Sequence, residues 1–396
     1  MHKIGEGGYA VVLRVRERSS GSIRVIKKIN DAFASDEDAQ RVVREVAYQR
    51  AVSHPNILPL IGCFCSTLSP DIYLLCPYLT CDLHEAVRQS WLSSPLQRQC
   101  VAFQLTCALG HMHATNALHR DLKPPNVLLD ERCRVQLCDF GLTRTVPRTC
   151  TGGAGGGAAP LDVSDSRGAP AAAAGAAEVG GSQRGGDGSG LVSRSVGSRW
   201  YRAPELLLGA SRYGTASDMW SLGCVLAELL SGRTLLLGAS NAAQLSKILA
   251  LTTGGVTLDA EDLADLGADP GVASALLAEA PTIEPIRLGK SMPRVPAEGI
   301  ELCRELLQLR PSSRLSASSV LRHAYFRDFV KGDAGRAAYA ERSCAAAASY
   351  QPPLDDDTRL SAAEYRRCME TSIATPLQEP VSAPTSSAVE MDDMGA

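Results

Sequence analysis

The segment LHRDLKPPN, which begins at residue 118, and the segment CDFG, a short strand later, constrain this chain more than any other feature. They supply a candidate base at Asp121, a cation at Lys123, an amide oxygen at Asn126 and a carboxylate at Asp139. Phosphoryl transfer needs such a set, because a hydroxyl proton must be accepted, the moving group needs a neighbouring charge, and magnesium prefers oxygen ligands. Each fragment alone is more often an ordinary turn or surface segment. The spacing H-R-D-x-K-x-x-N followed by D-F-G leaves little room for coincidence.

Length and charge exclude some functions. A chain of 396 residues can hold two or three domains, or one two-lobed domain with extensions. The net charge of −3 gives no basic surplus, so we expect no nucleic-acid partner. Thirteen cysteines are scattered without a CxxC pair, which favours a reduced compartment over a disulfide scaffold. No leader precedes the first glycines and no apolar run approaches ~20 residues, so we expect an intracellular protein without a membrane span.

The first strands that the sequence predicts surround a glycine turn. Residues 4–15 read IGEGGYAVVLRV, which is the pattern of a strand, a turn and a second strand. Such a turn lets backbone N–H groups approach triphosphate oxygens, although a plain hairpin explains the glycines equally well. The next predicted strand, residues 23–29, carries Lys27 among β-branched residues. Taken alone, a strand lysine is usually a solvated edge residue.

A helix is predicted from Ser35 to about Val52, with Ser35 as its N-cap and three acidic residues in its first turn. Residues at 3.6-residue spacing share one face of this helix: Val42, Glu45, Val46 and Gln49. Glu45 is therefore expected to point inward. An inward carboxylate needs a cation, and Lys27 is the candidate.

The later part of the chain is predicted to be mainly helical, with one long insert. A connector at residues 77–79 follows an apolar strand, and an amphipathic helix covers residues 97–115. Residues 147–192 are mostly Gly, Ala and Ser, so they cannot bury enough apolar surface to offset the entropy of ordering. Residues 331–357 are expected to be loose. Residues 359–373 are expected to form an amphipathic helix through Tyr365, Met369 and Ile373.

From residue 4 to about residue 329 the motifs resemble those of the eukaryotic protein kinases. The segments WYRAPE, from residue 200, and GRTL, from residue 232, are similar to the group that contains cyclin-dependent and mitogen-activated protein kinases. The segments KKINDAF, from residue 27, and DMWSLGC, from residue 218, are similar to the atypical extracellular-signal-regulated kinases. The resemblance implies the α+β fold class and a two-lobed kinase fold.

The lobes that this resemblance implies are a small β-rich N-lobe at residues 1–79 and a larger helical C-lobe at residues 80–329. The first strand is expected to be truncated, because Met1 stands close to the glycine turn. A C-terminal extension is expected at residues 330–375. A disordered tail is expected at residues 376–396.

The resemblance also assigns the catalytic and metal-binding roles. Asp121 would orient the substrate hydroxyl and accept its proton, while Lys123 offsets charge on the γ-phosphoryl group of ATP. Asn126 and Asp139 would hold Mg²⁺.

The resemblance implies a nucleotide site in which Lys27, held by Glu45, contacts the α- and β-phosphates of ATP. Adenine would bond the Pro77 carbonyl and the Leu79 N–H, with Cys76 as gatekeeper. The implied nucleotide-contacting residues are Ile4, Gly5, Gly7, Val12, Val25, Lys27, Glu45, Cys76, Pro77, Leu79, Asp82 and Leu128.

Substrate choice is implied by Arg202. In the kinases that this chain resembles, such an arginine turns a backbone carbonyl near Gly197 away from the substrate. The pocket that results favours proline after the target residue, because proline has no N–H to leave unpaired. We therefore expect protein substrates with Ser/Thr-Pro sites.

Other matching positions imply supporting contacts and a regulatory loop. Glu205 would pair with Arg314, Asp218 would brace the backbone at residues 119–120, and Ser198 would bond Asp121 and Lys123. Where the family has Thr-x-Tyr in its activation loop, this chain reads Ser193-Arg194-Ser195, which rules out dual Thr/Tyr phosphorylation there. A basic cluster suited to a loop phosphate matches Arg44, Arg120 and Arg144.

Three departures leave alternatives open. Gln49 stands where kinases commonly place an apolar side chain, Val25 replaces a small residue above adenine, and an acidic docking patch is reduced to Asp333. Gln49, Val25 and the truncated first strand keep a pseudokinase scaffold as the alternative, and a cyclin-dependent-type kinase that needs a partner subunit is the third reading. We expect a signalling kinase that is a monomer, in the cytoplasm or the nucleus.

Overall fold

The structure is a computed structural model of the chain, and it describes residues 1–7, 10–66, 69–145, 199–211, 213–331, 334–344, 350, 352, 354 and 358–374. The chain divides into two compact units. One unit joins Met1–Thr145 with Ala317–Ala396, and the other is Val146–Ser316. The insert predicted at 147–192 and the tail predicted at 376–396 lie outside the described residues.

The first unit contains a five-stranded antiparallel sheet in the order β1-β2-β3-β5-β4. Its strands are β1 (His2–Glu6), β2 (Ala10–Arg16), β3 (Ile23–Ile29), β4 (Gly62–Cys65) and β5 (Ile72–Pro77). The register places Val12 opposite Lys27, and Val25 opposite Cys76. Alternate residues of a strand face opposite sides of a sheet, and in β5 the buried positions alternate with partly exposed ones.

Helix α1 (Asp36–Ala51) follows the third strand, as the sequence predicts. It begins at Ser35, whose side chain accepts a hydrogen bond from the Asp38 N–H, and its first turn carries three acidic residues that suit the positive end of the helix dipole. The four residues predicted to share its inward face, Val42, Glu45, Val46 and Gln49, are all buried. Its amphipathic pattern therefore predicted both the helix and the side that it buries.

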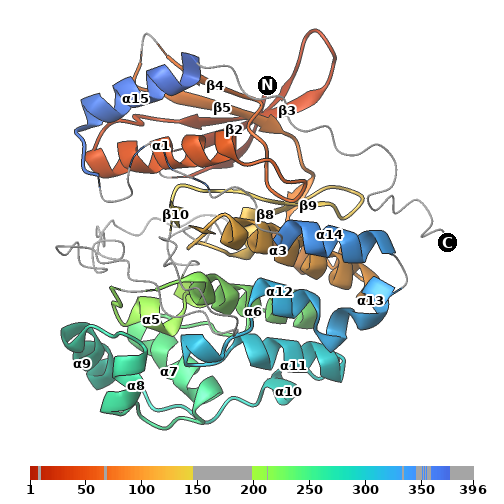
Figure 1. Cartoon of the computed structure of the whole chain (residues 1–396), viewed down its shortest axis with the longest axis vertical. Coiled ribbons are helices and arrows are strands. Elements are labelled where there is room, and N and C mark those ends of the chain that lie inside the picture. The colour runs from red at the N-terminus through yellow and green to blue at the C-terminus, as the bar shows by residue number, and fades with distance from the viewer. Residues whose placement is uncertain are drawn as a thin grey trace, which may run out of the picture. The chain divides into compact units, whose positions relative to one another are not determined.

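Helix α15 (Ala362–Ala374) packs along α1, and Figure 1 shows the two helices side by side. Tyr365 and Met369 are 2% and 1% exposed and belong to the apolar cluster that also contains Val42 and Ala10. Ile373 is partly buried against the same cluster. The amphipathic helix predicted at residues 359–373 is therefore confirmed, and α15 shares one core with the first strands and α1.

The sequence-based expectation that residues 331–357 are loose is wrong for part of that range. Residues Ala334–Cys344 form helix α14, which packs on α3 (Pro95–Ala114). A Cβ atom at Gly110 of α3 would lie 2.5 Å from the Cys344 Sγ, so the missing side chain permits this close contact. The prediction failed because the burial of α14 depends on α3, more than 200 residues earlier in the chain.

Short elements complete the first unit around α3, which begins at a capping box made by Ser94 and Gln97. Two small sheets, β10-β7 and β6-β8-β9, belong to the same unit, and all of their strands except β6 follow α3 in the chain. The elements are β6 (Cys81–Asp82), α2 (Leu83–Arg88), β7 (Ala117–Leu118), the 3₁₀ turn η1 (Pro124–Asn126), β8 (Val127–Leu129), β9 (Val135–Leu137), β10 (Arg144–Thr145), α12 (Ala317–Leu321), η5 (Ala324–Phe326) and α13 (Arg327–Lys331).

The second unit is helical in its described residues. Its elements are η3 (Arg199–Tyr201), α5 (Pro204–Leu207), α6 (Thr215–Ser231), α7 (Asn241–Thr252), α8 (Ala260–Asp265), α9 (Pro270–Glu279), α10 (Leu288–Ser291), α11 (Ala297–Leu306) and η4 (Pro311–Ser313). Helix α6 is buried almost throughout, and its Gly223 lies against α11, where an added Cβ would be 2.9 Å from the Leu306 Cβ. A sheet-rich beginning and a helical remainder confirm the α+β class.

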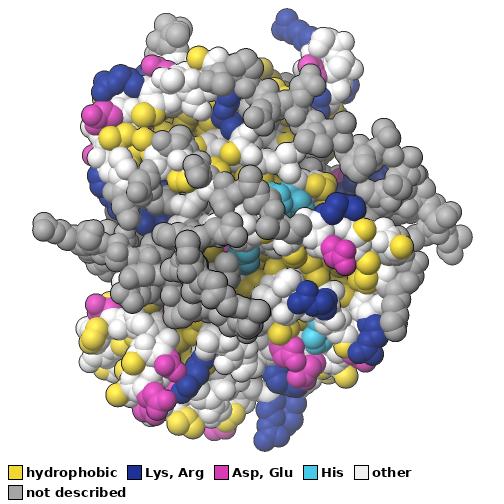
Figure 2. Space-filling view, in the orientation of Figure 1, with side chains coloured by type: hydrophobic (Ala, Val, Ile, Leu, Met, Phe, Trp, Pro, Cys, Tyr) yellow, Lys and Arg dark blue, Asp and Glu magenta, His cyan; other side chains and the backbone are white. Residues whose placement is uncertain are grey.

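The remaining observations concern helix hydropathy and surface charge. Among the residues that the structure describes, no helix is both long enough and apolar enough to cross a membrane. On the face drawn in Figure 2, Lys and Arg side chains are interspersed with Asp and Glu, in keeping with the small net charge of −3.

Candidate active site

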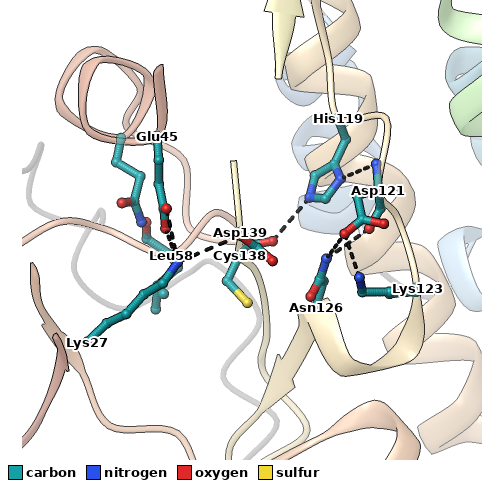
Figure 3. A network of polar contacts seen from close by, with 10 residues as sticks. Lys27, Glu45, Leu58, His119, Asp121, Lys123, Asn126, Cys138 and Asp139 are labelled. Carbon is teal, nitrogen blue, oxygen red and sulfur yellow. Dashed lines mark hydrogen bonds and ion pairs between the residues drawn. The ribbon is translucent and has the colours of Figure 1, made fainter. Parts of the chain in front are cut away.

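Lys27 and Glu45 form a two-oxygen ion pair between the sheet and α1, which is the partnership that the sequence predicts. The Lys27 Nζ donates to Glu45 Oε1 at 2.6 Å and to Oε2 at 2.9 Å. The Asp139 Oδ1 lies 3.7 Å from the same ammonium (Figure 3). Burial raises the pKa of the Glu45 carboxyl, and the charge of Lys27 lowers it less than burial raises it. The pair therefore fixes a cation at the inner end of the site.

The glycine turn lies between β1 and β2, as predicted. The Gly7 N–H donates to the Ala10 carbonyl at 2.8 Å and closes the turn, whose tip lies outside the described residues. Among the expected nucleotide contacts here, Ile4 is exposed, and Gly5 pairs with Val12 across a strand irregularity. An added Cβ at Gly5 would lie 3.5 Å from the Val12 Cβ, an ordinary contact, so packing in this structure does not itself demand glycine there.

The strand β5 leads into the predicted adenine connector. Cys76 is 6% exposed, and burial raises the pKa of its thiol to about 12, so the group is a neutral thiol at physiological pH. Asp82 caps α2 by accepting from the Glu85 N–H at 2.8 Å, and it pairs with Leu128 between β6 and β8. Leu79 and Leu128 both pack against the apolar cluster of the sheet. Cys76, Leu79 and Leu128 therefore share one apolar cluster of the first unit.

The loop after β7 holds Asp121 by two neighbours. The Lys123 Nζ lies 2.5 Å from the Asp121 Oδ2, and the Asn126 Nδ2 donates to the Asp121 backbone carbonyl at 2.8 Å (Figure 3). The side chains of Lys123 and Asp121 are only 10% and 15% exposed. A partly buried ion pair of this kind fixes a carboxylate in one orientation. All three residues belong to the segment LHRDLKPPN, which begins at residue 118.

His119 joins this loop to the D-F-G segment. Its Nδ1 accepts from the Asp121 N–H at 3.3 Å, which places its proton on Nε2, and Nε2 donates to the Cys138 carbonyl at 3.1 Å. The Cys138 N–H in turn donates to the Asn126 carbonyl at 2.9 Å. The candidate base and the candidate metal ligands are therefore held by one hydrogen-bond network.

Two residues of the site adopt left-handed backbone conformations that are costly for any side chain. Arg120 has φ 68° and Asp139 has φ 70°. Such conformations cost about 1–3 kcal/mol each and persist only where the surrounding structure holds them. Their position on either side of Asp121 and Asn126 is typical of a functional site.

Asn126 and Asp139 fit a magnesium ion by their chemistry. The Asn126 Nδ2 is committed to Asp121, so the amide oxygen is the atom left to face a ligand, and the Asp139 side chain is 32% exposed. A neutral amide oxygen and a carboxylate oxygen are ligands that Mg²⁺ accepts, together with water and phosphate oxygens. These residues would hold the ion beside the Lys27 ammonium.

Gln49 stands on α1 where kinases commonly place an apolar side chain. It is 5% exposed, and its Nε2 donates to the Leu58 carbonyl at 3.2 Å. Tyr48 of α1 supplies an aromatic contact to Phe140, and the two ring centroids lie 5.0 Å apart. Sequence reasoning missed Tyr48, although it lies three residues after Glu45 and so within reach of the same face.

The three arginines of the predicted phosphate cluster occupy different elements of the first unit. Arg44 lies on α1, and the Arg120 Nη1 donates to the Leu142 carbonyl at 3.4 Å. Arg144 is 8% exposed in β10, opposite Leu118 of β7. The predicted phosphate acceptors Ser193 and Ser195 lie outside the described residues.

The second unit contains the predicted Glu205–Arg314 pair, which is confirmed. The Arg314 Nη1 and Nη2 donate to the two Glu205 oxygens at 2.7 and 2.8 Å, and Ser217 also donates to Glu205. Burial favours a raised pKa for Glu205, but the charge and hydrogen bonds of Arg314 outweigh it, so the pKa is held below its ordinary value.

The segment before Arg202 is anchored within the same unit. The Trp200 Nε1 donates to the Gly238 carbonyl at 3.1 Å, and the Tyr201 hydroxyl donates to Glu228 at 2.7 Å. The Ser221 hydroxyl donates to the Tyr201 carbonyl at 2.8 Å. The contacts expected of Ser198 and Asp218 stay predictions.

Comparisons with known proteins agree with this set of residues. The family model of the protein kinase domain matches residues 1–156 and 175–326. Mitogen-activated protein kinase 15 of Mus musculus is 34% identical over 369 residues, which cover 92% of this chain and 58% of the relative. Its counterpart in Xenopus laevis is 32% identical over 366 residues, or 92% and 54% of the two chains. Extracellular signal-regulated kinase 2 of Dictyostelium discoideum is 32% identical over 330 residues, or 83% and 79%.

This chain spans little more than half the length of the first two relatives and about four fifths of the Dictyostelium one. The family model covers most of the chain, including the residues that hold Asp121, Asn126 and Asp139. The chain therefore belongs to the protein kinase family, and within it is similar to mitogen-activated protein kinases of the atypical extracellular-signal-regulated branch.

Proposed function

We propose that the chain transfers the γ-phosphoryl group of ATP to serine and threonine hydroxyls of proteins, as a mitogen-activated-type protein kinase. The observation that carries the proposal is the placement of Asp121 between Lys123 and Asn126, in the network that leads through His119 and Cys138 to Asp139. Lys27, held by Glu45, stands 3.7 Å from Asp139. The proposal is supported because a candidate base, two cations and two candidate oxygen ligands all belong to one unit of the chain.

Each of the chain's own groups has a separate role in the proposed reaction. Asp121 orients the substrate hydroxyl and accepts its proton as the oxygen attacks phosphorus. The Lys123 ammonium offsets negative charge on the transferred group, and Lys27 steadies the phosphates that stay with the nucleotide. When bound, Mg²⁺ supplies charge neutralisation between neighbouring phosphate oxygens. The protein's contribution is mainly fixed geometry and fixed charge, which phosphoryl transfer chiefly requires.

The test is magnesium-ATP phosphorylation of a Ser-Pro-rich protein by the purified chain, beside the Asp121→Asn variant. We expect the variant to lose about 10²–10⁴-fold in kcat, the usual range for a general base, while its ADP affinity stays close to that of the parent. Equal activity in both proteins contradicts the role of Asp121. Activity in neither, with nucleotide binding retained, favours the pseudokinase scaffold.

We propose that the substrates carry proline after the target residue, and the support for this is Arg202. The neighbouring Trp200 and Tyr201 are anchored by Gly238 and Glu228, which gives Arg202 a fixed base. A Ser-Pro peptide should have a kcat/KM about tenfold or more above that of a matched Ser-Ala peptide. The alanine N–H of the Ser-Ala peptide would be buried without a hydrogen-bond partner, whereas proline has no N–H. Equal turnover of the two peptides contradicts the specificity.

We also propose that the protein acts as a monomer in the cytoplasm, with the nucleus as a second compartment. The scattered cysteine pattern supports a reduced compartment. Light scattering of the purified chain and imaging of a fluorescent fusion test the two statements separately.

A further inference from the structure

The D-F-G phenylalanine lies in an aromatic stack that begins in the catalytic loop. The Phe140 ring is fully buried and lies 5.6 Å from the His119 ring and 5.0 Å from the Tyr48 ring, centroid to centroid. Tyr48 is also fully buried. Offset and edge-to-face arrangements at such distances are favourable, so these rings fix one another's orientation.

The stack continues into the C-terminal extension through Tyr350. The Tyr350 ring meets Tyr48 edge-on, at 5.1 Å and an interplanar angle of 84°. The Tyr350 N–H donates to the carbonyl of Thr115 at 3.1 Å, and Thr115 is the buried C-cap of α3, four residues before His119. Tyr350 therefore connects α1 with the end of the helix that leads into the catalytic loop.

Tyr350 belongs to a group of extension side chains that face α1. Together with Pro352, Leu354 and Tyr365, it lines a hollow opposite Val43 and Ala47 of α1. Tyr365 and Leu354 also pack against the apolar cluster that contains Val43. The same turns of α1 carry Glu45, so the extension packs on the helix that holds Lys27.

The backbone of Asp139 needs such support. Asp139 has φ 70°, a conformation that a non-glycine residue keeps only where its surroundings hold it, and Phe140 is its immediate neighbour. Gln49, on the inward face of α1, uses its amide to donate to the Leu58 carbonyl at 3.2 Å. From the side of α1, the Tyr48 ring lies against Phe140, and the Tyr350 ring lies edge-on against Tyr48.

We propose that Tyr350 is a positioning residue for phosphoryl transfer: through Tyr48 and Phe140 it holds Asp139 in the conformation that binds Mg²⁺ beside the Lys27–Glu45 pair. The inference rests on the proposed kinase function and adds a role for the C-terminal extension. Without the Tyr350 ring, Tyr48 has room to turn away from Phe140. Asp139 then leaves its strained conformation more often, and the affinity for the metal falls before the affinity for the nucleotide does.

The experiment compares ADP affinity, with and without Mg²⁺, and the Mg²⁺ dependence of phosphorylation in four proteins: the parent chain, Tyr350→Ala, Tyr350→Phe and Tyr339→Ala. Tyr339 is a matched control, because it is a half-buried tyrosine of the same extension whose ring packs near His54 and Phe103. For Tyr350→Ala we expect the Mg²⁺ requirement to rise about fivefold, the range of one aromatic contact, and ADP affinity in EDTA to stay unchanged. Tyr350→Phe keeps the ring and should behave as the parent.

A purely structural role for Tyr350 predicts a different result. In that case Tyr350→Ala and Tyr339→Ala lower the unfolding temperature and leave the Mg²⁺ requirement where it was, which overturns the proposal. If Tyr350→Ala fails to fold, Tyr350→Leu replaces it. The Tyr48→Leu/Tyr350→Leu double variant should then need no more Mg²⁺ than Tyr48→Leu alone, since Tyr350 acts through Tyr48. Additive effects on the Mg²⁺ requirement contradict the coupling. ADP binding with and without Mg²⁺ reports on the metal site and needs no protein substrate. An inactive parent chain would therefore contradict the proposed function, while the role of Tyr350 in Mg²⁺ binding could still be measured.

Discussion

The Glu45 carboxylate holds the Lys27 ammonium with both of its oxygens, at 2.6 and 2.9 Å, although Glu45 itself is only 6% exposed. A buried carboxylate is kept charged by its cation, and the cation is kept in place by the carboxylate. Disturbing this pair is therefore costly, and it is a direct means to test the site.

Replacing the Glu45 carboxylate with an amide removes its charge and keeps nearly the same side-chain shape. We expect Glu45→Gln to lower kcat/KM about 10²-fold, because Lys27 loses the group that fixes it near the nucleotide phosphates. Steady-state kinetics and ADP binding measure the effect. Glu37→Gln, an exposed residue in the first turn of the same helix, is the control and should leave activity within about twofold.

Acid should inactivate the protein through Glu45 without weakening the fold through this residue. Burial raises the pKa of the Glu45 carboxyl, so it takes up a proton at a pH above the ordinary glutamate range of about 4.3 and releases its hold on Lys27. A group whose folded-state pKa is raised contributes stability that is complete below its unfolded pKa and lost as pH rises through the folded value.

The measurement is the pH profile of kcat/KM between about pH 5 and 8, beside urea unfolding at the same pH values. We expect an acid limb in the activity of the parent without a parallel loss of stability from this group. Glu45→Gln should lack that limb. An unchanged limb in the variant assigns it to another group.

The Glu205–Arg314 pair should dominate the stability of the second unit. Its side chains are 2% and 0% exposed, so removing one partner leaves the other charge buried and unpaired. We expect Glu205→Ala to lower the free energy of unfolding by about 3–5 kcal/mol, and the double variant Glu205→Leu/Arg314→Met to recover much of that loss. Denaturant unfolding measures both.

The pH dependence of this pair has the opposite sign to that of Glu45. Arg314 outweighs burial and lowers the pKa of Glu205, so the stability that Glu205 contributes is present above its unfolded pKa and lost as pH falls through the folded one. A single variant no less stable than the double one would argue against the pair as a buried charge interaction.

His54 should make the first unit sensitive to mild acid. Its ring stacks on that of His111 at 4.8 Å, and its two nitrogens contact the Asn56 N–H and the Ser343 hydroxyl, each at 3.1 Å. Burial, with a smaller effect from His111, lowers the pKa of His54 to about 3. The unfolded chain binds a proton near pH 6.5 and the folded chain does not, so stability falls as pH drops below about 6.5.

Between pH 6.5 and 5 this single group should cost about 2 kcal/mol of unfolding free energy. His54→Gln should flatten that part of the stability profile, and His2→Gln, at an exposed position, should leave it unchanged. Urea titrations at several pH values provide the comparison. A parent protein with a flat profile over this range would contradict the buried neutral state of His54.

Phosphate on the activation segment should raise activity. Ser193 and Ser195 replace the family's Thr-x-Tyr pair, and a phosphoserine adds the charge that the arginines Arg44, Arg120 and Arg144 match. We expect the double alanine variant to lose about tenfold or more in kcat. If it is as active as the parent, and active enzyme yields mainly phosphate-free loop peptide, this mode of regulation is excluded.

The sequence predicted those parts of the site that depend on short-range pattern and motif spacing. The N-cap and inward face of α1, and hence the meeting of Glu45 with Lys27, follow from helical periodicity and from the cost of burying a lone charge. Contacts between distant segments were not predictable in this way. Nothing near Tyr350 signals that its ring reaches Tyr48, and nothing in the alanine-rich stretch of α14 reveals that α3 will bury it. Such elements depend on surfaces that only the folded chain provides.

The placement of Tyr365 and Met369 in one core with Ala10 and Val42 has a consequence for synthesis on the ribosome. The strands of the first sheet emerge early, yet the side chains that cover α1 emerge more than 300 residues later. At roughly 5–20 residues per second, the apolar face of α1 waits on the order of tens of seconds for its cover. During that interval the unit exposes apolar surface that chaperones can bind.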